Sequence, residues 1–196
     1  MTVGASAGPV SAGRSARREA LLDAADRIVR RDGPTVSMAV IAAEAGITKP
    51  ILYRHFGDKG GLYQVLADRY TGQLLAVLQQ ALEAGTGRRD RVERTVAAYL
   101  GAIEQEPQVY RFLMHSAEAA PAQTQVRSFV DRLSALLAAG IAAELGVPAA
   151  RAAIWGAGIV GMVQAAGDWW LETQAVSRAE LVQELSELLF GAYGLG

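Results

Sequence analysis

The sequence predicts an all-α fold, and two observations support this prediction. Apolar residues recur at helical spacing between glycine and proline breaks, and no segment alternates apolar and polar residues strongly enough to predict a strand. The chain has 196 residues, of which 51% are hydrophobic and 20% charged, so it can bury a sizeable core. We therefore expect a compact helical protein without an internal repeat.

The first helix is predicted from about Arg14 to Arg31, where an apolar stripe runs until the Gly-Pro pair at 33–34. The preceding residues 1–13 are small and uncharged, and we expect them to form a disordered leader. Ser37 is predicted to cap a second, short helix, because its hydroxyl can accept a hydrogen bond from an amide in the first turn.

A third helix is predicted after the tight break at Gly46. Thr48 is a candidate N-cap, and Pro50 lies early in the helix, where its missing N–H costs nothing. Leu52 and Phe56 are four residues apart and are expected to anchor the helix to the core. The pattern predicts a helix-turn-helix, although hairpins of this kind are also common in proteins that never bind DNA.

The rest of the chain is predicted to be helical as well. Glycines, prolines and a capping box at Ser177 to Glu180 separate the remaining segments. The expected helices cover about 59–84, 89–105, 108–117, 122–145, 148–172 and 177–193.

The charge is distributed unevenly along the chain, although the net charge is only -1. Residues 14–70 contain ten basic and seven acidic residues, a net charge of +3, whereas the remainder contains nine basic and thirteen acidic residues, a net charge of -4. A basic front suits a protein that presents one end to phosphates, although a solvated charged face gives similar counts.

Several kinds of chemistry are disfavoured by composition. The chain has no cysteine and two distant histidines, so we expect neither a metal site nor a cofactor. No stretch reaches the roughly 18 uninterrupted apolar residues of a membrane span. No signal peptide is recognisable either, so a cytoplasmic protein without membrane contact is expected.

The outward residues of the third helix favour a nucleic-acid function. If Leu52 and Phe56 point inward, the residues left at or near the exposed side are Thr48, Lys49, Ile51, Tyr53, Arg54 and His55. Their hydroxyl, cationic and imidazole groups can bind phosphate oxygens. Lys59 adds a charge at the start of the next helix, where backbone amides also favour anions.

The residues Ala45-Gly46-Ile47-Thr48-Lys49-Pro50, Leu52-Tyr53-Arg54-His55-Phe56 and Asp58-Lys59 resemble the signature of the TetR family. The resemblance covers about residues 14–70 and implies a homodimer that places one recognition helix per half-site in successive major grooves of double-stranded DNA. It implies backbone contacts by Ser37, Thr48, Tyr53, His55 and Lys59, and base contacts by Lys49, Pro50 and Ile51, with Arg54 in the same interface. Gly60 and Gly61 depart from the family pattern, so the fourth helix is expected to fray or to start later.

The helix pattern and the resemblance together define three parts: a leader (1–13), a three-helix helix-turn-helix DNA-binding domain (14–58) and a helical ligand-binding and dimerisation domain (59–196). The segments around Tyr110-Arg111-Phe112, Val160-Gly161-Met162 and Trp169-Trp170-Leu171 are similar to actinobacterial TetR regulators of fatty-acid metabolism. This similarity implies a small hydrophobic effector such as a fatty acid or an acyl-CoA.

Aromatic and methionine side chains independently suggest an apolar cavity, lined by Tyr99, Tyr110, Phe112, Met114, Trp155, Met162 and Trp169. Such residues at helical spacing also occur as plain core. The run Gly156 to Gly161 spells G-x-G-x-x-G, but it lies inside a predicted helix and lacks the strand that a dinucleotide site needs. Family resemblance makes dimer contact its expected role, with pocket lining as the competing use; the candidate interface residues are Gly156, Gly158, Gly161, Leu185, Leu188 and Leu189.

Two other classes of function compete with a regulator. An enzyme would need an acid-base pair, for which Asp168, Glu172 and His115 are candidates, but isolated carboxylates on helices are usually solvated. A helical protein-interaction module would leave the chemistry of residues 48–59 unexplained. We therefore expect a ligand-responsive transcriptional regulator, with repression relieved by ligand as the default and activation as an alternative.

Overall fold

The computed structural model describes residues 9–115 and 120–193 of the protein. Over these ranges it consists of helices joined by short connections, and it contains no strand. The helices are α1 (Pro9–Asp32), α2 (Met38–Glu44), α3 (Lys49–Phe56), α4 (Lys59–Glu83), α5 (Arg88–Gln105), α6 (Pro107–His115), α7 (Ala120–Leu145), α8 (Ala149–Thr173) and α9 (Arg178–Tyr193). The predicted all-α fold is confirmed.

The helix boundaries differ most from the prediction at the amino terminus. α1 begins at Pro9, whereas the sequence predicted a start at about Arg14. Proline suits a first helical turn, because the N–H that it lacks would have no partner there. Residues 9–13 are therefore helical rather than part of a disordered leader, and residues 1–8 lie outside the described residues.

The start of α4 also differs from the expectation. The Asp58 carboxylate accepts a hydrogen bond from the Gly61 amide at 2.7 Å and caps the helix, which begins at Lys59 without delay. A side chain at position 61 would overlap the carbonyl oxygen of Phe56. The expectation that Gly60 and Gly61 would fray this helix is therefore wrong, because Gly61 permits the tight turn from α3 into α4.

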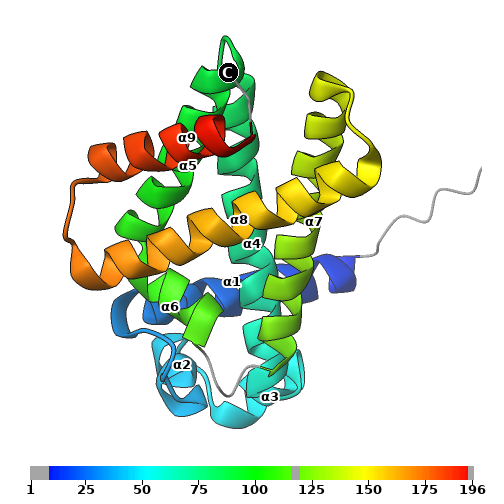
Figure 1. Ribbon diagram of the computed structural model, residues 1–196. Helices are drawn as coiled ribbons and strands as arrows, with labels where there is room; N and C mark the ends of the chain where they lie inside the picture. Colours follow the sequence, from blue (N-terminus) through cyan, green and yellow to red (C-terminus); the bar gives the residue numbers. More distant parts are fainter. Residues whose placement is uncertain (1–8, 116–119, 194–196) are drawn as a thin grey trace, which may run out of the picture.

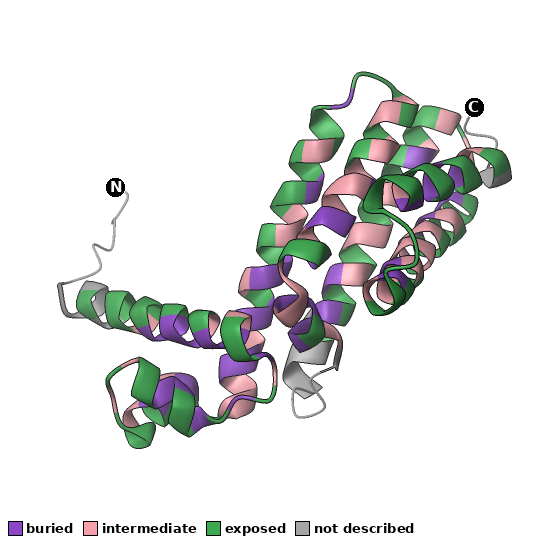
Figure 2. Ribbon diagram, turned by 90° about the vertical axis from the view of Figure 1, so that its left-hand side faces the viewer, coloured by how far each residue is buried: buried purple, intermediate pink, exposed green. Residues whose placement is uncertain are grey.

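The helices form two parts connected by α4 (Figure 1). The first three helices lie together at one end of the molecule, and α4 runs from there between α5 and α7. α8 packs on α7, and α9 packs on α5. In Figure 2 the described residues form an elongated molecule, with the α2–α3 hairpin toward one end and α5, α8 and α9 toward the other.

Buried side chains form two clusters, and α6 contributes to both. The first cluster joins α1–α4 to Val109, Phe112 and Leu113 of α6. The second joins α5, α8 and α9 to Tyr110 of the same helix. Met114 packs against both clusters. The first core therefore extends past the predicted domain boundary at residue 58 into α4 and α6.

Candidate nucleic-acid interface

The α2–α3 unit has the geometry of a helix-turn-helix. The Ser37 hydroxyl accepts a hydrogen bond from the Val40 amide at 3.4 Å and caps α2. Between the helices Gly46 adopts a φ of +63°, a conformation that side chains other than glycine rarely adopt. Thr48 is the N-cap of α3, and its side chain forms no capping hydrogen bond. This hydroxyl is therefore available to another partner.

α3 has one buried and one exposed face. Leu52 and Phe56 are buried, as predicted, and attach the helix to the first core. The exposed residues are Thr48, Lys49, Pro50, Tyr53 and Arg54, while Ile51 and His55 are half-buried. The structure thus places the predicted recognition-helix residues along one helix, with their polar groups largely accessible to a partner.

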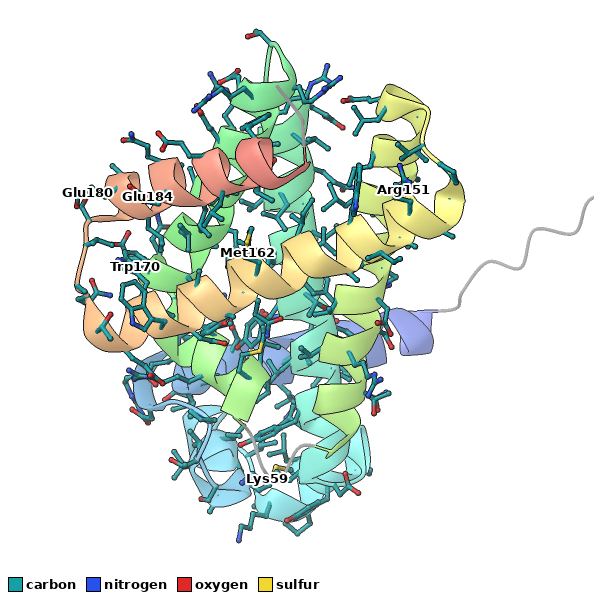
Figure 3. The ribbon with its side chains drawn as sticks, viewed as in Figure 1. Lys59, Arg151, Met162, Trp170, Glu180 and Glu184 are labelled. Atoms are coloured by element: carbon teal, nitrogen blue, oxygen red, sulfur yellow. The ribbon has the colours of Figure 1, made fainter. Side chains whose placement is uncertain are left out.

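The start of α4 adds Lys59 to this end of the molecule (Figure 3). Its Nζ lies 5.2 Å from the ring centroid of Tyr63. The Tyr63 ring is fully buried, and its hydroxyl lies 2.8 Å from the carbonyl oxygen of Pro34 and 3.2 Å from that of Val36, donating to both in a bifurcated arrangement. Tyr63 therefore fixes α4, and with it Lys59, against the loop before α2. This role of Tyr63 could not be predicted from the sequence, because an aromatic residue in an apolar stripe gives no sign of the partner of its hydroxyl.

The effector-binding candidates do not form a single lining. Phe112 lies in the first core, with its ring centroid 4.8 Å from that of Tyr63 and 5.7 Å from that of Tyr70, in edge-to-face contact. Trp169 is 47% exposed. Its neighbour Trp170 is fully buried and donates from its indole N–H to the Val176 carbonyl at 2.8 Å.

Four of the predicted residues gather at the second core: Tyr99, Tyr110, Met114 and Met162 (Figure 3 labels Met162 and Trp170). The Tyr99 hydroxyl donates to that of Tyr110 at 3.3 Å, and Tyr110 donates to Asp168 Oδ1 at 2.5 Å. Burial raises the pKa of the Tyr99 hydroxyl to about 12 and also raises the pKa of Tyr110. Both hydroxyls therefore remain protonated at neutral pH and connect α5, α6 and α8. Trp155, on the same helix as Met162, is half-buried.

A groove of about 380 Å³ lies between α6 and α7. Its lining consists of Leu113, Met114, Val126, Arg127, Val130 and Asp131. Only Met114 belongs to the predicted set. The α7 residues escaped sequence analysis because aliphatic side chains on a helix have the same pattern whether they line a groove or fill a core.

The predicted dimer-interface residues separate into two groups. A Cβ at Gly156 would lie 2.5 Å from the Ser134 carbonyl oxygen, so this glycine permits close packing of α8 on α7 within the chain. Leu185 and Leu189 are buried in the second core. These three residues are therefore not available to a partner. Gly158, Gly161 and Leu188 are exposed.

The candidate acid-base residues of an enzyme do not form a catalytic pair among the described residues. Tyr110 binds Asp168, Glu172 is exposed, and the side chain of His115 lies outside the described residues. The G-x-G-x-x-G run lies inside α8, as expected, rather than in a turn between a strand and a helix.

Fold and interface together define a helix-turn-helix DNA-binding regulator, and comparison with known proteins gives the family. Residues 21–66 match the model for bacterial regulatory proteins of the tetR family, and residues 77–195 match the tetracyclin repressor-like C-terminal domain. The chain belongs to the TetR family of transcriptional regulators. It is accordingly a DNA-binding protein and not an enzyme.

Two relatives and one solved structure illustrate the similarity. The chain is 30% identical over 179 residues to the uncharacterized HTH-type transcriptional regulator Rv0472c of Mycobacterium tuberculosis, covering 90% of this chain and 76% of that protein. It is 31% identical over 161 residues to the HTH-type transcriptional activator FasR of Mycolicibacterium smegmatis, covering 81% and 74%. A tetR-family regulator from Streptomyces coelicolor has the same fold, with a TM-score of 0.72 at 22% identity over 92% of this chain and 82% of that chain.

Proposed function

We propose that the protein acts as a cytoplasmic homodimer that binds a palindromic operator and responds to a small hydrophobic effector. The exposed face of α3 carries this proposal. Lys49, Pro50 and Ile51 lie in its first turn and would reach base edges, while Ser37, Thr48, Tyr53, His55 and Lys59 would hold the DNA backbone. Arg54 adds a further cation to the same exposed face.

The exposed residues of α8 support a dimer. Ile154, Gly158, Gly161, Ala165 and Trp169 follow one another at helical spacing and are all exposed. By length and composition α8 could even cross a membrane, and only 11% of its most apolar window is buried within the chain. Monomers rarely expose so continuous an apolar surface. A second copy would cover this stripe together with Leu188, which is also exposed on α9.

The α6–α7 groove supports a hydrophobic effector, with acyl chains as the candidate class. Leu113, Val126 and Val130 give one side of this open groove an apolar lining, and Arg127, which shares the lining with Asp131, could meet a carboxylate or phosphate head group. α6 also contacts the DNA-binding end, because Glu106, immediately before it, pairs with Arg30 of α1. An effector that separates α6 from α7 would thereby shift α1 and its attached helices.

We propose repression relieved by ligand as the direction of control. An effector that favours a spacing of the two recognition helices unsuited to the operator would weaken DNA binding. The relative FasR is named an activator, so activation is the second candidate.

The first experiment is native mass spectrometry of the purified full chain. A dimer that carries a hydrophobic compound would support the proposal and identify a molecule to titrate against DNA binding. A monomer under the same conditions would contradict the dimer, and a polar bound compound would contradict the hydrophobic effector.

DNA recognition is tested with a duplex that the wild-type protein selects from a randomised pool. Lys49→Ala should weaken binding to this duplex and relax the preference at one position of each half-site, by about 1–3 kcal/mol of discrimination. Arg132→Ala removes the same charge from an exposed position of α7 and should leave binding unchanged. Equal affinity of both variants would contradict the assignment of α3.

A further inference from the structure

Several basic residues of the DNA-binding end differ in whether a carboxylate of the chain binds them. Four arginines pair with carboxylates of the chain: Arg27, Arg30, Arg31 and Arg69. By contrast, Arg17, Lys49 and Arg54 are exposed, and none of the three forms an ion pair within the described part of the chain. Two of these three cations lie on the recognition helix. The third, Arg17, lies near the amino end of α1.

The amino-terminal turns of α1 form an extension that the family match does not cover. The helix begins at Pro9, whereas the family model begins at residue 21. Within this extension Arg17 and Arg18 are the cations whose side chains are described. The neighbouring carboxylate of Glu19 does not offset them, because Arg69 binds it at 2.7 Å. The extension therefore presents a net positive charge.

Arg18 ties this extension to the recognition helix. Its guanidinium lies 5.1 Å from the ring centroid of Phe56, the last residue of α3. A guanidinium stacked on a ring keeps its N–H groups directed outward in its plane, where they can still bind phosphate. In Figure 2 the amino-terminal end of α1 projects away from the regulatory helices, at the end of the molecule that carries the helix-turn-helix.

We propose that Arg17 and Arg18 form a second DNA contact, which binds phosphates adjacent to those held by α3 and α4. The proposal rests on the DNA interface assigned to α3 and extends it along each half-site. We assign it charge neutralisation without base reading, because both arginines lie on α1 and not on the recognition helix α3. The contact should therefore add affinity and salt dependence but no sequence preference.

The test compares single arginine variants of the full chain on the selected duplex, extended by flanking base pairs. Fluorescence anisotropy at a series of NaCl concentrations gives the slope of log Kd against log salt. Arg17→Ala should reduce this slope by about 1 per protomer, because each neutralised phosphate contributes about 0.9. Arg17→Lys should restore it, and Arg132→Ala, a charge-matched change on α7, should leave it unchanged.

The outcomes separate this proposal from the assignment of α3. If Lys49→Ala weakens binding but Arg17→Ala has the same slope as Arg132→Ala, the extension does not contact DNA and the proposal is overturned. If neither Lys49→Ala nor Arg17→Ala changes binding, both assignments are overturned. Arg17 is exposed and forms no ion pair with the described residues, so weaker DNA binding by Arg17→Ala with unchanged thermal unfolding supports a direct contact.

Discussion

Two tyrosines at the DNA-binding end show how far the role of one residue type depends on its surroundings. Tyr63 is fully buried, and its hydroxyl bonds to the carbonyls of Pro34 and Val36. Tyr53, ten positions earlier, is 41% exposed on α3. The first hydroxyl holds the fold together, whereas the second is the one that we propose contacts a phosphate.

The same substitution should therefore affect stability at one position and DNA binding at the other. Tyr63→Phe leaves buried carbonyls without their donor and should lower the free energy of unfolding by about 1–3 kcal/mol, measured by urea denaturation. Tyr53→Phe should leave the unfolding free energy unchanged and weaken binding to every DNA sequence similarly. A loss of stability in Tyr53→Phe equal to that in Tyr63→Phe would contradict the assigned roles.

The buried hydroxyl of Tyr99 predicts a pH dependence. Its pKa in the folded protein is raised to about 12 from an ordinary value of 10.0, so the unfolded chain ionises first as pH rises. The unfolding free energy should hold below pH 10 and decline as pH rises toward 12. Urea midpoints across this range should fall less steeply in Tyr99→Phe, and an identical decline in both proteins would show that another group is responsible.

At the scale of the helices, the α7–α8 contact depends on one small residue. Gly156 lies where a Cβ would meet the backbone at Ser134 and Ala138, so α8 cannot approach α7 with a larger residue there. Backbone atoms cannot swing aside as a flexible side chain does. The close approach of α7 and α8 therefore requires a glycine at position 156.

Gly156→Ala should lower the unfolding free energy, by about 1–3 kcal/mol as for other overpacked sites. Gly140→Ala on α7 is the matched control, because nothing lies within 4 Å of its Cβ position. The control should raise stability by up to about 1 kcal/mol through helix propensity. Stabilisation by both alanines in thermal unfolding would show that α7 and α8 do not pack closely in solution.

The sequence predicted helices better than it predicted which way α8 faces. Periodicity located each helix, since glycine and proline breaks are local signals, and it correctly placed Leu52 and Phe56 in the core. α8 is apolar around most of its circumference, so its pattern could not show that Trp170 is buried and Trp169 exposed. Which side of α8 is buried depends on its contacts with α5, α7 and α9, and these contacts leave no trace in the local sequence pattern.

At the scale of the whole molecule, the exposed stripe on α8 predicts the oligomeric state. Ile154 is 72% exposed in the single chain, an unusual position for a large aliphatic residue on an apolar helix. If a second copy covers it, a charge at this position would be buried without a partner.

Ile154→Asp should therefore shift the protein from dimer to monomer, as measured by light scattering coupled to size-exclusion chromatography, and weaken operator binding with it. Leu82→Asp introduces the same charge at an exposed leucine on α4 and should leave the dimer intact. A dimer that persists equally in both variants would place the interface elsewhere.

Because α6 contributes to both buried clusters, the DNA-binding helices of this protein cannot be exchanged independently of the regulatory helices. Phe112 fills the space between Tyr63 and Tyr70, so the DNA-reading end completes its core with a side chain supplied more than forty residues farther along the chain. In a hybrid that joins only residues 9–58 to another regulator, the first three helices would therefore pack against an α6 that does not match them. Because we propose that the exposed side chains of α3 read the operator, exchanging only these residues should change specificity and leave the contacts of α6 intact.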